Sequence, residues 1–207
     1  MTAGRVIRSF AAPGTTAVGL AWDGRFLWHS NSATNIIYQI EPTTGQVIRS
    51  FVAPGGDSDN LAWDGKVLWL TDVSTDLIYQ IDPVSGRVIR SLATPGTLSI
   101  GLAWDGRALW SADFGTDLIY QVDPVSGQVV RSFAAPSANV RGLTWDGKYL
   151  WFANYAANII YQLDPTAGRV IRSFTGPGQY PHGMAYDGRC LWLCDPGTDT
   201  IYLIEVS

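Results

Sequence analysis

The sequence predicts an all-β fold, a five-bladed β-propeller with four antiparallel strands in each blade. Three observations predict it. A unit recurs at a spacing of 41 residues through the whole chain, each unit alternates short apolar segments with turn residues, and no segment has helical apolar periodicity. Four strands in about 40 residues, repeated in tandem, are typical of propeller blades. We expect one domain over residues 1–207, with repeats at 4–44, 45–85, 86–126, 127–167 and 168–207.

The repeat is carried by short motifs. Trp-Asp-Gly at residues 22–24 returns at every unit, as Tyr-Asp-Gly in the last one, and Leu27-Trp28 returns with it. Units 45–85 and 86–126 are identical at 26 of 41 positions. This identity indicates recent amplification of one unit or an engineered repeat protein. Departures such as Tyr186, Cys190 and Cys194 follow no design logic and favour a natural gene.

Each unit contains four predicted strands. In the first unit, residues 19–22 are apolar and end at Asp-Gly, a strong signal for a tight hairpin. Residues 26–29 form the second strand, and a polar loop leads to the third at residues 36–40. A Pro-to-Gly turn then leads to the fourth strand at residues 47–51.

The phase of the repeat predicts how the ring closes. The chain begins at residues 5–10 with a fourth-strand sequence, and residues 201–204 match a third strand. Pairing these segments completes the last blade and removes two free sheet edges. We therefore expect a closed monomeric ring in which residues 5–10 form the outer strand of the fifth blade. An open solenoid, or a larger ring of several chains, is the alternative.

Most recurring residues have structural explanations. The two Trp of each unit are expected to fill the space between neighbouring sheets, with a recurring Asp or Asn accepting from the indole N–H. Two Asp/Asn registers (equivalent positions in successive units) flank the loop after the second strand, and we predict that they cap main-chain groups. Five metal sites are the alternative, but Asn replaces Asp freely and would remove charge from such sites. The registers are Asn31, Asp72, Asp113, Asn154 and Asp195, and Asn35, Asp76, Asp117, Asn158 and Asp199.

Structural roles are also expected for the outer arginines and for the two cysteines. One Arg per unit falls on the predicted outer strand, where we expect a solvated face that discourages edge-to-edge association. Cys190 and Cys194 lie four residues apart on one predicted strand, so their Cα atoms are roughly 13 Å apart. That separation is too long for a disulfide, and we predict free, buried thiols. The outer arginines are Arg8, Arg49, Arg90, Arg131 and Arg172.

Composition excludes several classes of protein. Only 15% of residues are charged, against roughly 25% in an average soluble domain, and the abundance of aromatic residues excludes intrinsic disorder. No apolar run approaches the roughly 20 residues of a membrane helix. The net charge of −4 disfavours nucleic acid as a partner. Because no apolar run of membrane-helix length is present, we expect no membrane partner. The first five residues lack the apolar stretch of a signal peptide, and we leave the localisation open.

The positions where the units differ indicate a site. Among the charged residues, only Asp57, Asp59 and Arg141 stand at non-recurring positions, all in loops joining a fourth strand to the next first strand. In propellers these loops share one face with the loops after the second strand, around the mouth of the central channel. One register just before the inner strand is fully divergent, and we expect it to ring the mouth. It contains Val18, Asp59, Ile100, Arg141 and His182.

These side chains suit ligand binding. Arg141 can bind a carboxylate or phosphate by bidentate hydrogen bonds, and Asp59 can balance it or accept from a ligand donor. His182 can bind a metal or move a proton near neutral pH. Neutral drift, or an Arg141–Asp59 ion pair that plugs the channel, is the alternative. The predicted ligand-binding set is Asp57, Asp59, Arg141 and His182 with an aromatic rim of Phe114, Tyr155 and Tyr180, and no metal or cofactor is predicted.

The blade motif resembles that of a known group. Gly19-Leu20-Ala21-Trp22-Asp23-Gly24, Leu27-Trp28, Ile37-Tyr38-Gln39-Ile40-Glu41-Pro42 and Gly45 are similar to the repeats of the glutamine cyclotransferase and YncE/NHL-like propellers. The resemblance covers the whole chain and describes the blade, not a reaction. It implies a five-bladed propeller, and plant-type glutaminyl cyclases of this group use polar and aromatic residues at the channel mouth. Their catalytic acid is not carried over to a particular residue here, because the mouth registers offer only Asp57 and Asp59 and no Glu.

Three functions follow as hypotheses. The preferred one is a non-catalytic binding or scaffold propeller, whose small molecule, peptide or protein partner docks at the channel mouth. The second is an enzyme of cyclotransferase or lyase type, with Asp59 and His182 as acid and base. The third is a multivalent lectin, which requires binding residues repeated in every blade, whereas the mouth positions are the least repeated ones.

Overall fold

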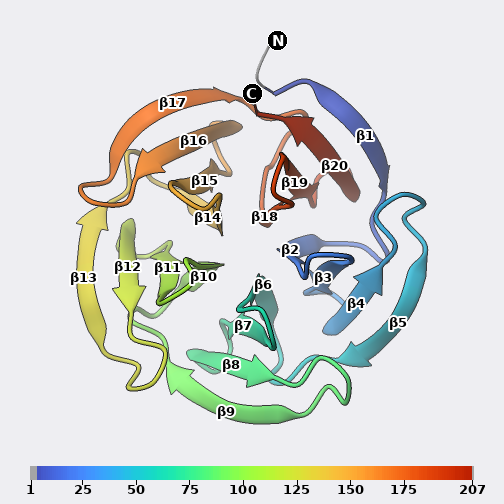
Figure 1. Ribbon diagram of the computed structural model, residues 1–207, viewed down its shortest axis with the longest axis horizontal. Helices are drawn as coiled ribbons and strands as arrows, with labels where there is room; N and C mark the ends of the chain where they lie inside the picture. The colour runs from blue at the N-terminus through green and yellow to red at the C-terminus, as the bar shows by residue number, and fades with distance from the viewer. Residues whose placement is uncertain (1–3, 207) are drawn as a thin grey trace.

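Twenty β-strands form five four-stranded antiparallel sheets in a computed structural model that describes residues 4–206. The sheets stand around a central axis as propeller blades, with the first strand of each blade at the centre and the last at the rim (Figure 1). Blade 1 consists of β2 (Ala17–Trp22), β3 (Leu27–Asn31), β4 (Ile36–Ile40) and β5 (Val47–Val52). The predicted fold class is therefore confirmed.

The other blades repeat this order. Blade 2 is β6 (Ser58–Trp63), β7 (Leu68–Asp72), β8 (Leu77–Ile81) and β9 (Val88–Ala93). Blade 3 is β10 (Ser99–Trp104), β11 (Leu109–Asp113), β12 (Leu118–Val122) and β13 (Val129–Ala134). Blade 4 is β14 (Val140–Trp145), β15 (Leu150–Asn154), β16 (Ile159–Asp164) and β17 (Arg169–Thr175). Blade 5 is β18 (Met184–Tyr186), β19 (Cys190–Asp195), β20 (Thr200–Glu205) and β1 (Val6–Ala11).

Predicted and observed strands differ only at their ends. In blade 1 the inner strand begins at Ala17, two residues before the predicted start, and the second strand continues to Asn31. The two ends pair with each other across a bulge between Ala17 and Gly19. Main-chain pairing therefore continues for a few residues beyond the apolar run by which the sequence marks each strand.

Strand β1 closes the ring by pairing with β20. Phe10 is opposite Ile201 and Ala11 is opposite Thr200 in an antiparallel ladder, and Arg5 forms a 2.9 Å ion pair with Glu205. Figure 1 shows strands β1 and β20 side by side at the rim of this blade. The predicted closure is confirmed, and no blade in the described part of the chain lacks its outer strand.

The core lies between neighbouring blades. Trp28 and its counterparts Trp69, Trp110, Trp151 and Trp192 are buried there among Leu and Ile side chains. The first Trp of each unit, represented by Trp22, is only half-buried and packs at the edge of these clusters. The Trp28 set thus fills the space between sheets as predicted, and the Trp22 set packs against the same clusters while it stays partly exposed.

The aspartate of the Asp-Gly turn accepts from the buried indole. Asp23 Oδ2 lies 2.8 Å from Trp28 Nε1, and Asp23 Oδ1 accepts from the main-chain N–H groups of Arg25 and Phe26. The same bond from indole to carboxylate occurs in the other four blades. It satisfies a polar group that is otherwise buried in an apolar core. The loop Asp and Asn residues, which we also considered as acceptors, do not take this role.

Those loop residues cap their loops, as predicted. Asp72 Oδ2 accepts from the main-chain N–H groups of Gly56 and Asp57, and its Oδ1 accepts from Thr75 N–H. The second register has a left-handed backbone, with φ of 53° at Asn35. Asn and Asp tolerate that conformation better than other non-glycine residues, which explains why only they recur there.

Outer arginines link one blade to the next. Arg49 Nε donates to Gln39 Oε1 at 2.9 Å, its guanidinium lies 5.2 Å from the centre of the Trp28 ring, and its NH1 donates to the carbonyl of Val84 in blade 2. The predicted solvated face is therefore wrong for this register, in which only Arg8 is exposed. Leu203 replaces the Gln beside Arg8, so that arginine lacks the side-chain acceptor.

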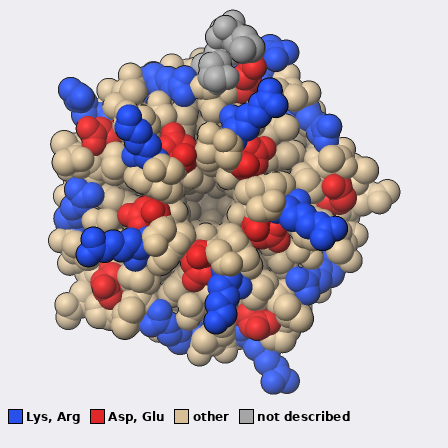
Figure 2. Space-filling view, in the orientation of Figure 1, with Lys and Arg blue, Asp and Glu red and all other residues tan. Residues whose placement is uncertain are grey.

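Charges are otherwise spread around the ring. Figure 2 shows basic side chains beside acidic ones in every sector of one face, with no single-sign patch.

Cys190 and Cys194 are free and buried, as predicted. Nowhere in residues 4–206 is there a helix with the length and hydropathy needed to cross a bilayer.

Removal of residues 1–11 should strongly destabilise the ring. Strand β20 would lose its ladder partner, and Phe10 would no longer pack on Trp192, where the ring centroids are 5.9 Å apart. We expect the melting temperature to fall by about 10 °C or more and the protein to self-associate through the exposed edge. Differential scanning calorimetry and size-exclusion chromatography measure both effects.

A synthetic peptide spanning residues 4–12 provides the control. Added in excess to the truncated protein, it should restore most of the melting temperature by pairing with β20. An unchanged melting temperature of the truncated protein without peptide would show that β1 does not close the ring.

Candidate functional site

Inner strands approach one another closely at the hub. A Cβ at Gly142 would collide with the carbonyl oxygen of His182 in the next blade, and Gly19, Gly101 and Gly183 meet the same obstacle in their own neighbours. Glycine is therefore required wherever the next blade comes this close. The exception in this register is Asn60 in blade 2.

The residue before each hub glycine, and before Asn60, belongs to the mouth register. Its carbonyl is held by the preceding blade: Ser30 Oγ donates to the Asp59 carbonyl, and Thr71 Oγ1 donates to the Ile100 carbonyl at 3.1 Å. His182 Nδ1 lies 2.8 Å from the Val18 carbonyl. The backbone under the mouth is thus fixed by contacts between blades.

All five side chains of the mouth register line one pocket of about 390 Å³ at the end of the channel. The structure therefore brings together the residues that the divergent register predicted. Neighbouring loops complete this mouth pocket. It is lined by Thr16, Val18, Ser32, Asp57, Asp59, Val73, Leu98, Ile100, Phe114, Arg141, Tyr155, His182 and Pro196.

Arg141 is held between two aromatic rings. Its guanidinium carbon lies 4.6 Å from the centre of the Phe114 ring and 5.0 Å from that of Tyr155. Its Nε is buried and has no hydrogen-bond partner. Within residues 4–206 no carboxylate lies within 4.0 Å of it, so the Arg141–Asp59 ion pair that we considered as a plug does not form. Its charge therefore remains uncompensated by direct contact.

The aromatic rim extends outward from this arginine. Tyr155 stacks on Tyr180 with ring centroids 4.9 Å apart, and it meets His182 edge-on at 6.1 Å. Tyr180 is 41% exposed and lies beyond the pocket lining. The rim thus supplies one packed wall of the mouth and one ring open to solvent.

Asp59 and His182 face each other across the channel. Asp59 Oδ1 and His182 Nδ1 are 3.7 Å apart, and the two residues are 7% and 3% exposed. Because His182 Nδ1 donates to the Val18 carbonyl, the ring proton of the neutral imidazole is on this nitrogen. Asp59 Oδ1 is buried without a partner.

Burial drives the two groups to their neutral forms. Loss of solvent raises the pKa of Asp59 to about 8, helped by the charges of Asp57 and Asp72 and opposed by Arg141. Burial and the nearby charge of Arg141 lower the pKa of His182 to about 3. At neutral pH the pair is a carboxylic acid beside a neutral imidazole, so Arg141 is the dominant charge in the interior of the mouth.

Asp57 lies at the periphery. Its side chain is exposed, and its main-chain N–H donates to Asp72. Asn60 was not identified from the sequence, although it is the one departure from glycine in its register. Its amide Nδ2 is buried with no partner, directly after Asp59 in the chain. Leu98 and Thr16 were also missed, because apolar and small polar residues give no signal among variable loop positions.

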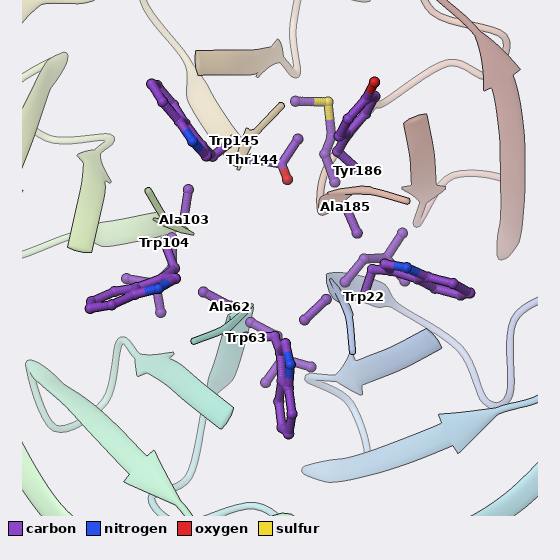
Figure 3. Close-up of a pocket in the computed structure, with 14 residues that line it drawn as sticks. Trp22, Ala62, Trp63, Ala103, Trp104, Thr144, Trp145, Ala185 and Tyr186 are labelled. Atoms are coloured by element: carbon purple, nitrogen blue, oxygen red, sulfur yellow. The ribbon is translucent and has the colours of Figure 1, made fainter. Parts of the chain in front are cut away.

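The opposite end of the channel differs in kind. A small hollow of about 80 Å³ lies there, among the ends of the inner strands (Figure 3). Repeated residues line it, including Trp22, Trp63, Trp104 and Trp145, with Thr144 replacing the alanine found in the other blades. This volume accommodates only a few waters, so it is too small for an organic ligand.

Within residues 4–206 there is no group of three or more His, Cys, Asp or Glu side chains arranged to hold a metal ion. The loop carboxylates of the Asp/Asn registers are engaged by main-chain donors instead, as at Asp195, whose Oδ2 accepts from the N–H groups of Gln179 and Tyr180.

Solved structures share this architecture. A Myxococcus xanthus glutaminyl cyclase superposes with a TM-score of 0.83 at 15% identity, over 98% of this chain and 97% of that one. A chain of a nidogen/laminin complex matches with a TM-score of 0.69 at 19% identity, over 94% and 77% of the two chains. A catalytically inactive virginiamycin B lyase from Staphylococcus aureus with quinupristin matches with a TM-score of 0.58 at 22% identity, over 96% and 69%.

These likenesses show the fold alone. No protein-family model and no curated protein matches the sequence. The resemblance of the repeats to the glutamine cyclotransferase group is confirmed at the level of the five-bladed architecture. Propellers host many unrelated activities, so the function must be argued from the mouth pocket itself.

The buried Asp59 should make stability fall as the solution becomes alkaline. Its pKa in the folded protein, about 8, lies above its ordinary value of 3.8, so the folded state binds the proton more tightly and loses stability as pH rises between these values. His29 and His182, whose pKa values are lowered to about 4 and 3, act in the opposite direction, mostly below pH 6.5 but with a residual effect up to about pH 7.5. From pH 6.5 to 8.5 the loss of about 2 kcal/mol from Asp59 is partly offset by the two histidines, so the free energy of unfolding should drop by about 1 kcal/mol.

Asp59→Asn tests this assignment. The amide cannot ionise, so urea denaturation should show no such drop for this variant, while the exposed-site control Asp76→Asn, which reproduces the residue of blades 1 and 4, should retain it. An equal drop in the wild type and Asp59→Asn would mean that another group causes it.

Proposed function

We propose that the protein binds a small organic carboxylate at the channel mouth and acts as a non-catalytic binding propeller. One observation supports this above the others: Arg141 is clamped between Phe114 and Tyr155, has a buried Nε without a partner, and faces a pocket of about 390 Å³. A buried donor left unsatisfied is costly unless a ligand or water accepts from it. The volume lies in the usual range for small-molecule sites.

The electrostatics favour a singly charged anion. Arg141 is the one Lys or Arg among the residues that line the mouth pocket, and Asp57 adds a negative charge at its edge. A phosphate dianion would meet one cation and one repelling carboxylate. A carboxylate needs only one bidentate partner, which a guanidinium supplies.

The rest of the mouth pocket complements such a ligand. The protonated Asp59 can donate a hydrogen bond to a carboxylate oxygen, whereas an ionised one would repel it. His182 Nε2 is the acceptor nitrogen of the neutral ring and suits a ligand hydroxyl or N–H. Val18, Ile100 and the rim rings supply apolar walls. A ligand with a carboxylate, a hydrogen-bond donor and an apolar body matches Asp59, His182 and the apolar walls respectively.

A multivalent lectin is not favoured. The pocket has one copy at the axis, and its polar residues occur in single blades. A protein partner at this face remains compatible with the proposal if it presents a carboxylate, such as its C-terminus.

Benzoate and its neutral amide, benzamide, provide a matched pair of probes. Wild-type protein should bind benzoate at least tenfold more tightly than benzamide, measured by ligand-observed NMR titration, because only benzoate pairs with Arg141. Arg141→Ala should remove this preference, and Arg141→Lys should retain part of it. Arg189→Ala, a basic residue of a recurring register after an Asp-Gly turn, is the control and should bind as wild type. Equal affinity of the wild type for both probes would contradict the proposal.

Benzoate affinity should also decline above pH 8. Ionisation of Asp59, with its pKa of about 8, places a second negative charge beside the bound carboxylate. The decline should be absent in Asp59→Asn. A pH-independent affinity in the wild type would indicate that Asp59 does not touch the ligand.

Catalysis is the second candidate, favoured by the Asp59–His182 pair. Two groups 3.7 Å apart, with pKa values driven in opposite directions, are arranged as an acid and a base. Two neighbours are named as a glutaminyl cyclase and a virginiamycin B lyase, so a peptide with N-terminal glutamine and quinupristin are the substrates to test. Turnover by wild type that is lost in both Asp59→Asn and His182→Gln would support an enzyme. Binding of benzoate without turnover supports the non-catalytic function.

A further inference from the structure

A second cleft opens on blade 3, away from the channel mouth. It has a volume of about 220 Å³ and lies where the second strand leaves the Asp-Gly turn and passes the outer turn of the blade. Ala108 forms its floor and is 6% exposed. We call it the blade 3 cleft; it is lined by Arg107, Ala108, Gln121, Asp123, Pro124 and Val130.

The other blades show what belongs in this space. The counterparts of Ala108 include Phe26 in blade 1 and Tyr149 in blade 4. Each of these rings lies under the basic side chain that precedes it, with Arg25 4.7 Å from the Phe26 ring centre and Lys148 4.8 Å from that of Tyr149. Blade 3 keeps the basic residue, Arg107, but has a methyl group where those blades have a ring.

The polar groups around the blade 3 cleft are already engaged, except for the arginine. Gln121 donates to Asp105 and accepts from Arg131 Nε. Asp123 accepts from the main-chain N–H and hydroxyl of Ser126, and these bonds hold the pKa of its carboxyl below the usual range. No hydrogen bond or ion pair of the Arg107 guanidinium occurs within residues 4–206. The cleft therefore offers one free cation above an apolar floor.

The cleft is large enough for a ring. Apolar cavities of roughly 150 Å³ hold benzene, and this cleft exceeds that volume. A cation over an aromatic face is attracted by the negative charge of the ring's π-face. Size and charge thus both match the group that blades 1 and 4 supply from their own chain.

The position of the cleft favours a peptide as the source of the ring. Val130, one of its walls, lies on β13, which is the rim strand of blade 3. No strand in residues 4–206 pairs with the outer edge of β13, so its free main-chain groups can receive an extended segment. A peptide along this edge would carry alternate side chains toward the sheet face beside it.

We propose that the blade 3 cleft binds the Phe or Tyr side chain of a peptide segment, whose ring takes the place that Phe26 and Tyr149 fill in their own blades. The site is independent of the channel mouth and of the function proposed for it. It makes blade 3 a second, blade-specific docking point on the outer part of the ring.

N-acetyl-tyrosinamide is the probe, and N-acetyl-alaninamide is its control. In ¹H–¹⁵N NMR titrations the tyrosine probe should shift the signals of Arg107, Ala108 and Val130, and the alanine probe should not. Ala108→Phe fills the cleft with the ring of blade 1 and should weaken binding at least tenfold. Ala108→Val, which reproduces the residue of blade 2, is a milder version and should weaken it less.

Tyr149→Ala is the matched gain-of-function variant. It opens the equivalent space under Lys148, so it should bind a second tyrosine probe in blade 4 and leave the blade 3 shifts unchanged. Arg141→Ala at the channel mouth should leave the shifts caused by the tyrosine probe in blades 3 and 4 unchanged. Absence of shifts at blade 3 in the wild type, or equal binding by Ala108→Phe, would overturn the proposal. If p-cresol binds as tightly as N-acetyl-tyrosinamide, the ring is accommodated but a peptide is not the occupant.

Discussion

The close approach of five inner strands at the hub is the constraint on which the rest of this structure depends. Each inner strand brings a carbonyl oxygen against the backbone of the preceding blade, where only glycine fits at four of the five positions. The hub is therefore narrow. The residue before each of these five positions belongs to the mouth register, and its side chain lines the mouth pocket. Five side chains from blades far apart in the chain thus meet at one place, whatever their chemistry.

Interactions that repeat in every blade make this hub rigid. The turn aspartate holds the buried indole, and in most blades a Gln and an Arg extend that network outward to the next blade. Since these repeated bonds involve no residue of the mouth register, the frame does not rely on the side chains at the mouth. Variation at the mouth is consequently tolerated by the fold, and that is where the blades diverge. Strand β1 completes the frame by giving β20 a partner, so the ring has no missing strand among residues 4–206.

The chemistry of the mouth follows from the burial of its titratable side chains. Asp59 and His182 are so enclosed that the charged form of each is disfavoured, and each stays neutral near pH 7. Arg141 supplies a positive charge, and its guanidinium carbon lies 4.6 Å and 5.0 Å from the centres of the Phe114 and Tyr155 rings. The mouth therefore presents a single positive charge with a neutral donor and a neutral acceptor nearby. Three of the buried polar atoms without a hydrogen-bond partner, Asp59 Oδ1, Arg141 Nε and Asn60 Nδ2, lie at or directly beside the mouth register.

The sequence by itself determined the blade number, the strand order, the closure by the first strand and the register that forms the mouth, because all of these are periodic and the 41-residue spacing displays them directly. Only the tertiary structure decided what the aspartate of the Asp-Gly turn bonds to, why the outer arginines are half-buried, and that Asp59 and His182 are neutral. It also decided that Arg141 pairs with rings rather than with Asp59, and that Ala108 leaves a cleft. These properties depend on distances across blades and on exclusion of water, which a periodic pattern does not encode, because a side chain's partners and its protonation are set by neighbours that folding brings together.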